Sequence, residues 1–288
     1  MVDLVSSIRD RIFPIVVVDV GAMLLGSPLD VPYRALIEKE LCQVIGFEPI
    51  REECDRLNAQ TRPGDRYLPY AVGDGTERTF HRCNENATSS LYPPNDEVLE
   101  RFTQLPEFLR VVSKTPFQTH RLDDIEEVSA ADYLKLDVQG AELDVIRGAS
   151  RVLEHVLVAE VEVEFVQLYE KQPLFAEVDQ AMREAGFLFH RFASLQGRTF
   201  RPFVRKNPQP TQGQLLWGDA IYVKSFLRFR ELGVDRLLKL AAIMLEVYAS
   251  SDMMMLAVQM AEDLGGPKLW DSLSMQLLGR VKERAPLL

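Results

Sequence analysis

The chain has 288 residues, of which 47% are hydrophobic and 26% are charged, so it is long and apolar enough to bury a substantial core. This composition excludes a disordered or fibrous chain. Asp and Glu number 43 against 33 Lys and Arg, and the net charge of −10 would repel a phosphate backbone. We therefore expect no nucleic acid partner.

The three cysteines, Cys42, Cys54 and Cys83, form no CxxC pair, so neither a disulfide framework nor a structural zinc site is indicated. The longest apolar stretches, such as 240–245 and 253–258, are far shorter than the roughly 20 residues that a bilayer requires. The N-terminus lacks the pattern of a signal peptide. These features predict a cytoplasmic protein with reduced thiols and no membrane partner.

Strand and helix patterns alternate along the first part of the chain. The β-branched run at 15–18 is apolar on both faces, as a buried parallel strand requires. The predicted elements are a helix at 3–12, a strand at 15–18, a helix at 32–41, a strand at 43–49, a helix at 51–60 and a strand at 67–72.

Residues 77–121 give a mixed pattern, and the series then resumes with a strand, a turn and a helix that Gly148 interrupts. Within residues 77–121 the predicted elements are strands at 79–83 and 111–120, a polar loop at 84–96 and a helix at 98–105. The later elements are a strand at 132–138, helices at 142–153 and 174–185, strands at 156–163, 187–192 and 219–224, and a Pro-rich loop at 201–213.

Strands that alternate with helices of about ten residues specify a mostly parallel α/β sheet with helices on both faces. The last two strands have no room for a crossover helix between them, so they are expected to be antiparallel. Only helical patterns follow Phe226. We therefore divide the chain into a sheet domain at 1–225 and a helical extension at 226–288, whose apolar faces would cap the first domain or form a homodimer.

Acidic residues and a glycine stand where the first two strands end. Asp19 and Gly21 close the first strand and Glu48 closes the second, so all three would face one crevice. A carboxylate after the second strand can accept hydrogen bonds from ribose hydroxyls. No GxGxxG or GxxxxGK[ST] motif is present, and an Asp would repel a pyrophosphate. The pattern favours a nucleoside with a cationic group, such as S-adenosylmethionine. The alternative is that neither residue binds a ligand: Gly21 would then be only a turn glycine, and Glu48 a solvated acid at the start of a helix.

The segment LKLDVQGAELDVIRGA at 134–149, with VVVDVGA, GFEP, AVGDG and RLDDI before it, resembles the FkbM family of S-adenosylmethionine-dependent methyltransferases. The resemblance covers about residues 15–224. It implies the class I methyltransferase fold, a Rossmann-like, seven-stranded, mostly parallel sheet with helices on both faces and an antiparallel last strand. To this the chain would add its all-α C-terminal extension.

The resemblance also implies roles for individual residues. Asp19, Gly21 and Ala22 would line the methionine part of the cofactor, Glu48 would hold the ribose, Asp74 would lie near the adenine, and Asp137 and Glu142 would lie beside the methyl group. The chain departs from the family where Met23, Leu24 and Leu25 precede Gly26, and where Gln139 replaces an acid in the fourth motif. The second departure removes one possible metal ligand or base.

An alcohol that accepts a methyl group must lose its proton, so a general base is expected within hydrogen-bond reach. The candidate bases are Asp137, His120 and Glu164, with Glu162 and His190 as further possibilities. Glu160, Glu162 and Glu164 recur at period two and would share one strand face, unless the strand stops near Val161 and the later acids begin a helix. Asp137 with Glu162 or Glu164 could hold a cation, but no ligand spacing enforces one, and we predict no metal.

Several residues are expected to contact the molecule that accepts the methyl group. Ser89 and Ser90 lie in a polar loop that matches another family segment and would form either a lid over the acceptor or a solvated connector. Trp217 would either line the far wall of the site or belong to the core under the last strand. The predicted substrate residues are Ser89, Ser90, Gln139, Glu142, Glu162 and Trp217.

The resulting hypothesis is an S-adenosylmethionine-dependent methyltransferase that methylates a hydroxyl of a small molecule or glycan. A catalytically silent relative used for assembly is an alternative, because the first loop is altered. A nicotinamide-dependent oxidoreductase ranks last, because the glycine fingerprint is missing.

Overall fold

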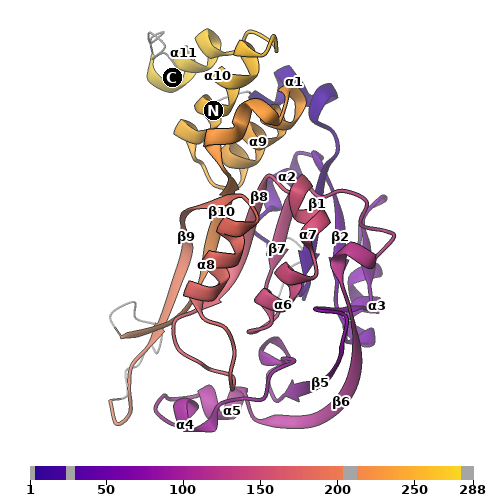
Figure 1. Ribbon diagram of the computed structural model, residues 1–288, viewed down its shortest axis with the longest axis vertical. Helices are drawn as coiled ribbons and strands as arrows, with labels where there is room; N and C mark the ends of the chain where they lie inside the picture. Colours follow the sequence, from indigo (N-terminus) through magenta and orange to yellow (C-terminus); the bar gives the residue numbers. More distant parts are fainter. Residues whose placement is uncertain (1–3, 24–29, 204–212, 280–288) are drawn as a thin grey trace. The chain divides into compact units, whose positions relative to one another are not determined.

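The computed structural model describes residues 4–23, 30–203 and 213–279, which form two compact units (Figure 1). One unit comprises Met1–Ile15, Val31–Gln43 and Ser225–Leu288, and the other comprises Val16–Asp30 and Val44–Lys224. The atypical first loop that the sequence singled out, from Leu24 to Gly26, lies outside the described residues.

The larger unit is organised by a seven-stranded sheet with the strand order β3-β2-β1-β7-β8-β10-β9. Its strands are β1 (Ile15–Val20), β2 (Cys42–Phe47), β3 (Arg66–Leu68), β7 (Tyr133–Leu136), β8 (Val158–Glu164), β9 (Phe187–Arg198) and β10 (Gln214–Lys224). The pairs β1 with β7, β7 with β8 and β2 with β3 are parallel, whereas β10 is antiparallel to both β8 and β9. The predicted class I methyltransferase sheet, with its antiparallel final strand, is confirmed.

Side chains of opposite character alternate along the inner strands. Leu134 and Leu136 of β7 and Val161 and Val163 of β8 enter one apolar core. Helices α6 (Glu142–Arg147), α7 (Ser150–His155) and α8 (Phe175–Glu184) supply the other side of this core, and they cover the sheet in Figure 1. Because successive side chains of a strand point to opposite faces, the residues between these four lie on the second face. That face carries the charged groups described below.

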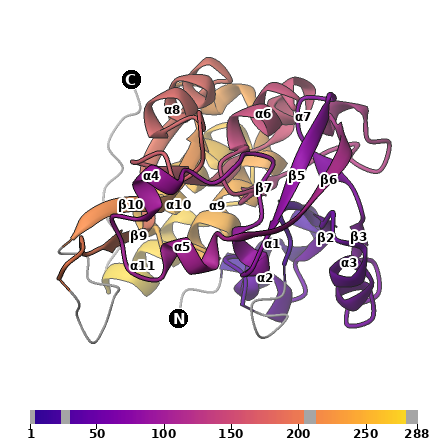
Figure 2. The same cartoon turned by 90° about the horizontal axis from the view of Figure 1, so that it is seen from below.

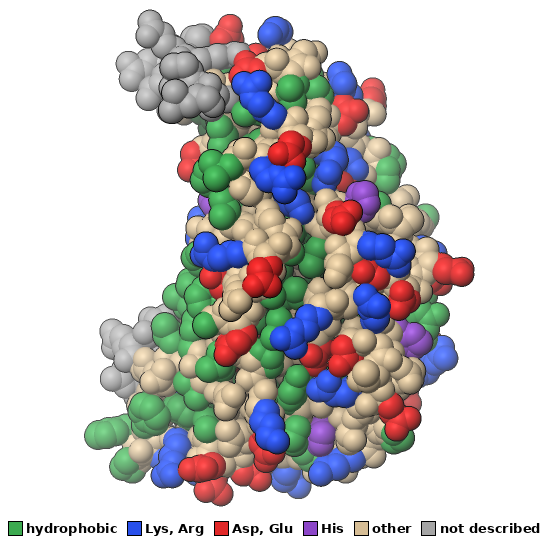
Figure 3. All heavy atoms as spheres, viewed as in Figure 1, with side chains coloured by type: hydrophobic (Ala, Val, Ile, Leu, Met, Phe, Trp, Pro, Cys, Tyr) green, Lys and Arg blue, Asp and Glu red, His purple; other side chains and the backbone are tan. Residues whose placement is uncertain are grey.

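Strand β8 runs without interruption to Glu164, so Glu160, Glu162 and Glu164 share the second face of the sheet. All three side chains are buried. The alternative that the strand stops near Val161 is therefore wrong. The three glutamates of this face are buried side by side, whereas on the surface shown in Figure 3 Asp and Glu lie interspersed with Lys and Arg.

A second, three-stranded sheet has the order β4-β6-β5 and forms a long ribbon that Figure 2 shows from below. Its strands are β4 (Ala71–Val72), β5 (Glu77–Cys83) and β6 (Val111–His120), with a short helix α3 (Arg51–Asn58) preceding them in the chain. The single strand predicted at 67–72 is thus divided between two sheets. Pro69, which has no N–H for a ladder, stands at the division.

Three predicted helices are shorter than expected or divided. The helix predicted at 98–105 is replaced by α4 (Asp96–Leu99) and α5 (Leu105–Phe108), because Gln104 has a φ of 70° and Pro106 follows it. The helix at 142–153 ends at Gly148, where an added Cβ would lie 2.3 Å from the carbonyl oxygen of Gly73. The helix predicted from Pro32 is the shorter α2 (Arg34–Glu38). Short turns complete the chain at η1 (Asn86–Thr88), η2 (Leu122–Asp124) and η3 (Phe226–Glu231).

A small second core holds the segment that carries α4 and α5. Leu99, Phe102 and Leu105 pack with Tyr169 and with Leu216 of β10. Backbone hydrogen bonds from Asn95 to Leu168 (2.9 Å) and from Glu170 to Pro93 (2.8 Å) fix the same contact. The polar loop is therefore attached to the loop that follows β8.

The helical unit contains α1 (Leu4–Ile12), α9 (Val234–Glu246), α10 (Ser251–Asp263) and α11 (Trp270–Leu278), together with α2. Helix α9 packs against α1, α2 and α10, and an ion pair of 2.5 Å joins Lys39 to Glu246. This unit differs from the predicted extension at 226–288, because the apolar face of the N-terminal helix α1 is buried within it. Among the described residues, no helix is long and apolar enough to cross a membrane.

Candidate functional site

The turn after β1 and the end of β7 touch one another. The N–H of Asp137 donates a hydrogen bond of 3.0 Å to the carbonyl of Val20. Gly21 has a φ of 86°, and a Cβ added there would lie 1.8 Å from the carbonyl oxygen of Asp137. Only glycine accommodates this approach. The N–H groups of Gly21 and Ala22 both reach Phe47 O at 3.0 Å, so the ends of β1, β2 and β7 form one continuous edge.

A buried lysine lies between the carboxylates of this edge. The Lys135 ammonium is 3.5 Å from Asp19 Oδ1 and 3.4 Å from Asp137 Oδ2. Burial alone would raise the pKa of Asp137, but Lys135 and a hydrogen bond from Gln139 hold that pKa below its usual value. Asp137 therefore presents a carboxylate at the strand ends, where a cationic ligand group would be stabilised.

Gln139 joins most of the side chains at this edge. Its Nε2 donates to Asp137 Oδ1 at 2.9 Å and to Glu162 Oε2 at 2.7 Å. Its Oε1 accepts a hydrogen bond of 3.0 Å from the hydroxyl of Tyr169, and its backbone carbonyl accepts one of 2.6 Å from Ser90. The amide can donate to two carboxylates at once, which an acid at this position could not do.

Glu142 and Glu164 lie in the same buried region with different partners. Glu142 Oε1 accepts hydrogen bonds from the N–H groups of Val138 (2.8 Å) and Gly140 (3.3 Å), so it holds the turn after β7. Burial raises the pKa of Glu142 to about 7. Burial first, and neighbouring carboxylates second, raise the pKa values of Glu162 and Glu164 well above the usual range. Glu162 and Glu164 therefore hold a proton more readily than Asp137 does.

Glu48 follows β2 and is 2% exposed. Its Oε1 accepts a hydrogen bond of 2.7 Å from the N–H of Ile50. Burial raises its pKa to about 7 in spite of that bond. A buried carboxylate of this kind is stabilised by ligand hydroxyls that donate to it.

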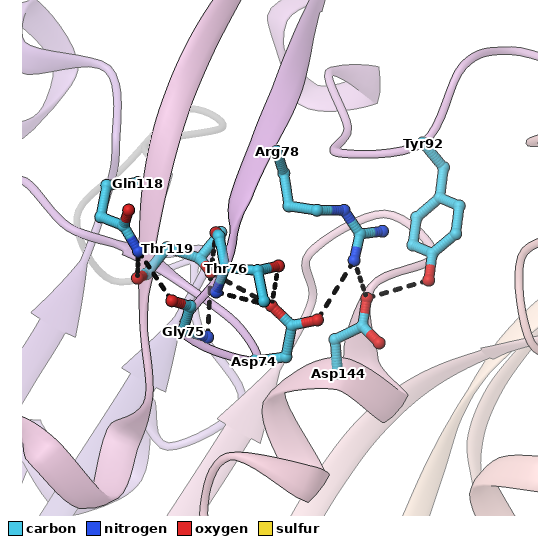
Figure 4. A network of polar contacts seen from close by, with 8 residues as sticks. All are labelled: Asp74, Gly75, Thr76, Arg78, Tyr92, Gln118, Thr119 and Asp144. Atoms are coloured by element: carbon cyan, nitrogen blue, oxygen red, sulfur yellow. Dashed lines mark hydrogen bonds and ion pairs between the residues drawn. The ribbon is translucent and has the colours of Figure 1, made fainter.

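Asp74 is the centre of the polar network in Figure 4. Its Oδ1 accepts hydrogen bonds from the Thr76 N–H (3.0 Å) and hydroxyl (2.6 Å), and its Oδ2 lies 3.4 Å from Arg78. Burial would raise the pKa of Asp74, but these donors lower it below its usual value. In the same network Gln118 Nε2 donates to Gly75 O at 2.7 Å, and Thr119 Oγ1 accepts from the Gly75 N–H at 3.1 Å. The network therefore fixes the turn between β4 and β5.

The same arginine reaches the loop that follows β5. Arg78 lies 3.3 Å from Asp144 Oδ2 of α6, and its guanidinium stands 5.0 Å from the centre of the Tyr92 ring. The Tyr92 hydroxyl donates to Asp144 at 2.9 Å. Ser90 is buried and bonded to Gln139, while Ser89 Oγ accepts from the Cys83 N–H at 3.0 Å. The predicted lid segment thus rests on the turn after β7.

Three further predicted residues lie on strands other than β1 and β7. His120 pairs with Val72 in the second sheet, and its ring packs 4.7 Å from that of Tyr70. Trp217 of β10 stands opposite Glu164 and carries the Arg198 guanidinium 4.8 Å from its ring centre. His190 lies on β9. No group of His, Cys, Asp and Glu within residues 4–23, 30–203 and 213–279 is arranged to hold a metal ion.

Sequence reasoning missed Lys135, Tyr169, Arg78 and Arg198. Lys135 could have been found, because a lysine between Leu134 and Leu136 in a strand must face the polar side of the sheet. The others gave no such signal, since their partners come from distant segments. In the structure, Asp19, Gly21, Ala22, Glu48 and Asp137 share one edge with Gln139, Glu142 and Glu162.

Comparison with known proteins gives a family match and distant structural likenesses. The family described as the methyltransferase FkbM domain matches residues 19–189, more than half of the chain. No curated protein sequence matches. Magnesium protoporphyrin IX methyltransferase from Synechocystis PCC 6803, solved with bound S-adenosylmethionine, is 13% identical over 77% of this chain and 74% of its own, with a TM-score of 0.37. A putative methyltransferase from Thermoplasma acidophilum is 9% identical over 74% and 69%, also at 0.37.

Proposed function

Because the chain belongs to the FkbM methyltransferase family, we propose that it transfers a methyl group from S-adenosylmethionine to a hydroxyl of a small molecule or glycan. The observation that carries this proposal is the edge where Asp19, Gly21, Glu48 and Asp137 meet. Nucleoside-binding α/β sheets bind their ligands at this end of the strands.

The residues present suit such a cofactor. The backbone at Gly21 lies too close to Asp137 for any side chain, which keeps the turn open to a ligand. Asp19 and Asp137 offer negative charge to the ammonium and sulfonium groups, and Glu48 offers a buried acceptor to the ribose hydroxyls. We assign Ala22 to the methionine side and Asp74 to the vicinity of the adenine, with Thr76 and Arg78 holding its carboxylate in place.

When bound, S-adenosylmethionine supplies an electrophilic methyl group whose carbon–sulfur bond electrons return to sulfur on transfer. Glu164 takes the proton of the acceptor hydroxyl, because its raised pKa makes it the stronger base. Asp137, with its lowered pKa, acts as an electrostatic partner of the donor rather than as the base. His120 is disfavoured as the base because it belongs to the second sheet. Glu162 and Gln139 hold Asp137 in position.

Ligand binding tests the proposal directly. S-adenosylhomocysteine at 100 times its dissociation constant adds about 2.7 kcal/mol of stability, which a thermal melt detects, and NAD serves as the comparison ligand. Stabilisation by NAD, and by neither sulfur compound, would contradict the proposal. Release of S-adenosylhomocysteine from S-adenosylmethionine is then measured with a panel of hydroxylated acceptors. Cofactor binding with no release in any mixture would favour a catalytically silent protein.

Substitutions separate the two roles. Glu164→Gln should leave the affinity for S-adenosylhomocysteine within about twofold and lower kcat by roughly 100-fold, which is typical for loss of a general base. Asp137→Asn should weaken binding of S-adenosylmethionine more than binding of a neutral nucleoside. A kcat unchanged in Glu164→Gln would remove Glu164 from the proposed mechanism.

A further inference from the structure

Arg198, the last residue of β9, is a buried cation with few partners. It is 8% exposed, and its Nη1 donates only to the neighbouring Gly197 carbonyl at 3.0 Å. Its Nε is buried and has no hydrogen-bond acceptor among the residues that the structure describes. Within the same residues, no carboxylate lies at ion-pair distance from Arg198. Burial lowers its pKa, with no opposing contribution from an acid.

The sequence around Arg198 excludes a carboxylate from its own hairpin. Residues 185–218 contain no Asp or Glu, although the chain has 43 acidic residues. The same stretch holds five cations, namely Arg191, Arg198, Arg201, Arg205 and Lys206. Residues 204–212, which the structure does not describe, therefore cannot neutralise Arg198 from within the hairpin. A buried cation without an acid is costly unless a ligand anion compensates it.

The register places Arg198 on the face of the sheet that carries the candidate site. Trp217 stands opposite Glu164 on β8 and Gln196 on β9, and Asp219 stands opposite Glu162 and Ser194. The Ser194 hydroxyl donates to Asp219 at 2.5 Å, so these residues share a face. Arg198 follows Ser194 and Gln196 at period two, and its guanidinium covers the Trp217 ring.

Strand spacing sets the separation from the proposed base. One strand, β10, lies between β9 and β8, and adjacent strands are about 4.8 Å apart, so β9 and β8 lie roughly 10 Å apart. Arg198 pairs with Gln214 of β10, three residues before the Trp217 that pairs with Glu164, so an offset of roughly 7–10 Å along the strands gives a backbone separation of roughly 12–14 Å from Glu164. That span suits a molecule that presents a hydroxyl to Glu164 and an anionic group to Arg198.

We propose that Arg198, stacked on Trp217, binds a carboxylate of the acceptor, so that the substrate is a hydroxylated carboxylic acid. This inference rests on the proposed function, because the acceptor is its substrate. A single guanidinium neutralises one negative charge, and its Nε and Nη2 edge can donate two parallel hydrogen bonds to a carboxylate. A doubly charged phosphate would meet the buried acids of β8 with a charge left over, so a carboxylate is favoured.

Paired probes test the charge requirement. Glucuronate, 4-hydroxybenzoate and glycerate are compared with glucose, 4-hydroxybenzamide and glycerol by calorimetry on the protein loaded with S-adenosylhomocysteine. At least one acid should bind ten times or more tightly than its neutral counterpart. Glucose 6-phosphate and inorganic phosphate form a separate arm. Acids that bind no better than their counterparts, or preferential binding of the phosphates, would overturn the proposal.

Variants assign the effect to Arg198. Arg198→Gln should weaken binding of the preferred acid at least tenfold and leave binding of the neutral counterpart unchanged, and Arg198→Lys should restore part of the loss. Arg201→Gln, an exposed arginine of the same hairpin, is the matched control and should bind the acid as the unaltered protein does. Equal losses in the Arg198 and Arg201 variants would indicate general attraction and contradict a site at Arg198.

Two further measurements, cofactor affinity and melting temperature, distinguish a carboxylate site at Arg198 from the proposed methyl transfer and from a purely structural role of Arg198. Affinity for S-adenosylhomocysteine should be the same in Arg198→Gln and in the unaltered protein. The acid titrations are also run on ligand-free protein, so that failure of cofactor binding would refute methyl transfer while an Arg198-dependent preference for acids could still be measured. The melting temperature of ligand-free Arg198→Gln should not fall below that of the unaltered protein, because the substitution removes an uncompensated buried charge. A lower melting temperature with unchanged acid binding would show that Arg198 only supports the fold.

Discussion

The amide of Gln139 lies 2.7 Å from Glu162 and donates a hydrogen bond to it, while the same nitrogen reaches Asp137 at 2.9 Å. One neutral side chain thus donates to two acidic groups at the ends of adjacent strands. Without this donor, their repulsion would act across a buried region.

Gln139→Glu should therefore destabilise the protein. The new carboxylate replaces a donor by an acceptor between two acids, and we expect a loss of about 1–3 kcal/mol in the free energy of unfolding at pH 8. The loss should shrink toward pH 5.5, as the raised pKa of Glu162 lets the cluster take up protons. Urea unfolding at both pH values measures this. Gln180→Glu, exposed on α8, is the control and should change stability by no more than about 0.5 kcal/mol. An equal loss at both pH values would contradict the electrostatic explanation.

Glu48 should make cofactor binding depend on pH. With a pKa of about 7, Glu48 is half ionised at neutrality, so ribose hydroxyls bound there as proposed would meet mostly a carboxylate above pH 7 and mostly a protonated acid below it. Affinity for S-adenosylhomocysteine should rise about tenfold from pH 6 to pH 8, which follows from the ionised fraction of such a group. Glu48→Gln should bind more weakly at pH 8 and show a flat profile. Glu52→Gln, exposed on α3, should keep the rise.

The same carboxylate should influence stability in the opposite direction. Burial raises the pKa of Glu48 from 4.5 to about 7, so the folded state binds more protons than the unfolded state between these values. The contribution of Glu48 to stability should therefore fall as pH rises through that window and level off above it. Glu48→Gln should remove this part of the slope in ligand-free unfolding experiments. An unchanged slope would show that Glu48 is ionised in the folded protein below neutrality.

Gly21→Ala tests the contact between β1 and β7. Its positive φ costs any side chain about 1 kcal/mol, and the added Cβ would also lie 1.8 Å from the Asp137 carbonyl, which is backbone and cannot move alone. We expect a loss of stability above about 3 kcal/mol or failure to fold. Gly279→Ala is the matched control, since its φ is 66° and nothing lies within 4 Å of the new Cβ. Similar losses in both variants would mean that the strand ends do not touch as described.

Much of this architecture followed from periodicity, while the contacts of the site did not. The β-branched run before Asp19 and the unit at 132–153 predicted strands that lie side by side in the sheet. The division of 67–72 between two sheets was missed, although Pro69, which has no N–H for a ladder, marks its place in the sequence. Arg78 and Arg198 were missed because their roles depend on partners such as Asp144 and Trp217, and local spacing carries no information about these pairings.

Arg78 should control how firmly the segment 86–92 is held. It joins Asp74 to Asp144 and covers the Tyr92 ring, so Arg78→Met removes two ion pairs and one cation–π contact at once (Figure 4). Amide hydrogen exchange in 86–92 should become at least tenfold faster, while exchange in β7 and β8 stays the same. Tyr92→Phe keeps the ring beside Arg78 and loses the hydrogen bonds of the hydroxyl, including the one to Asp144; it is the graded control and should give a smaller increase. If the segment serves as a lid over the acceptor, Arg78→Met should also raise KM for the acceptor more than KM for S-adenosylmethionine. Faster exchange with both KM values unchanged would leave the segment a structural connector and rule out its role as a lid.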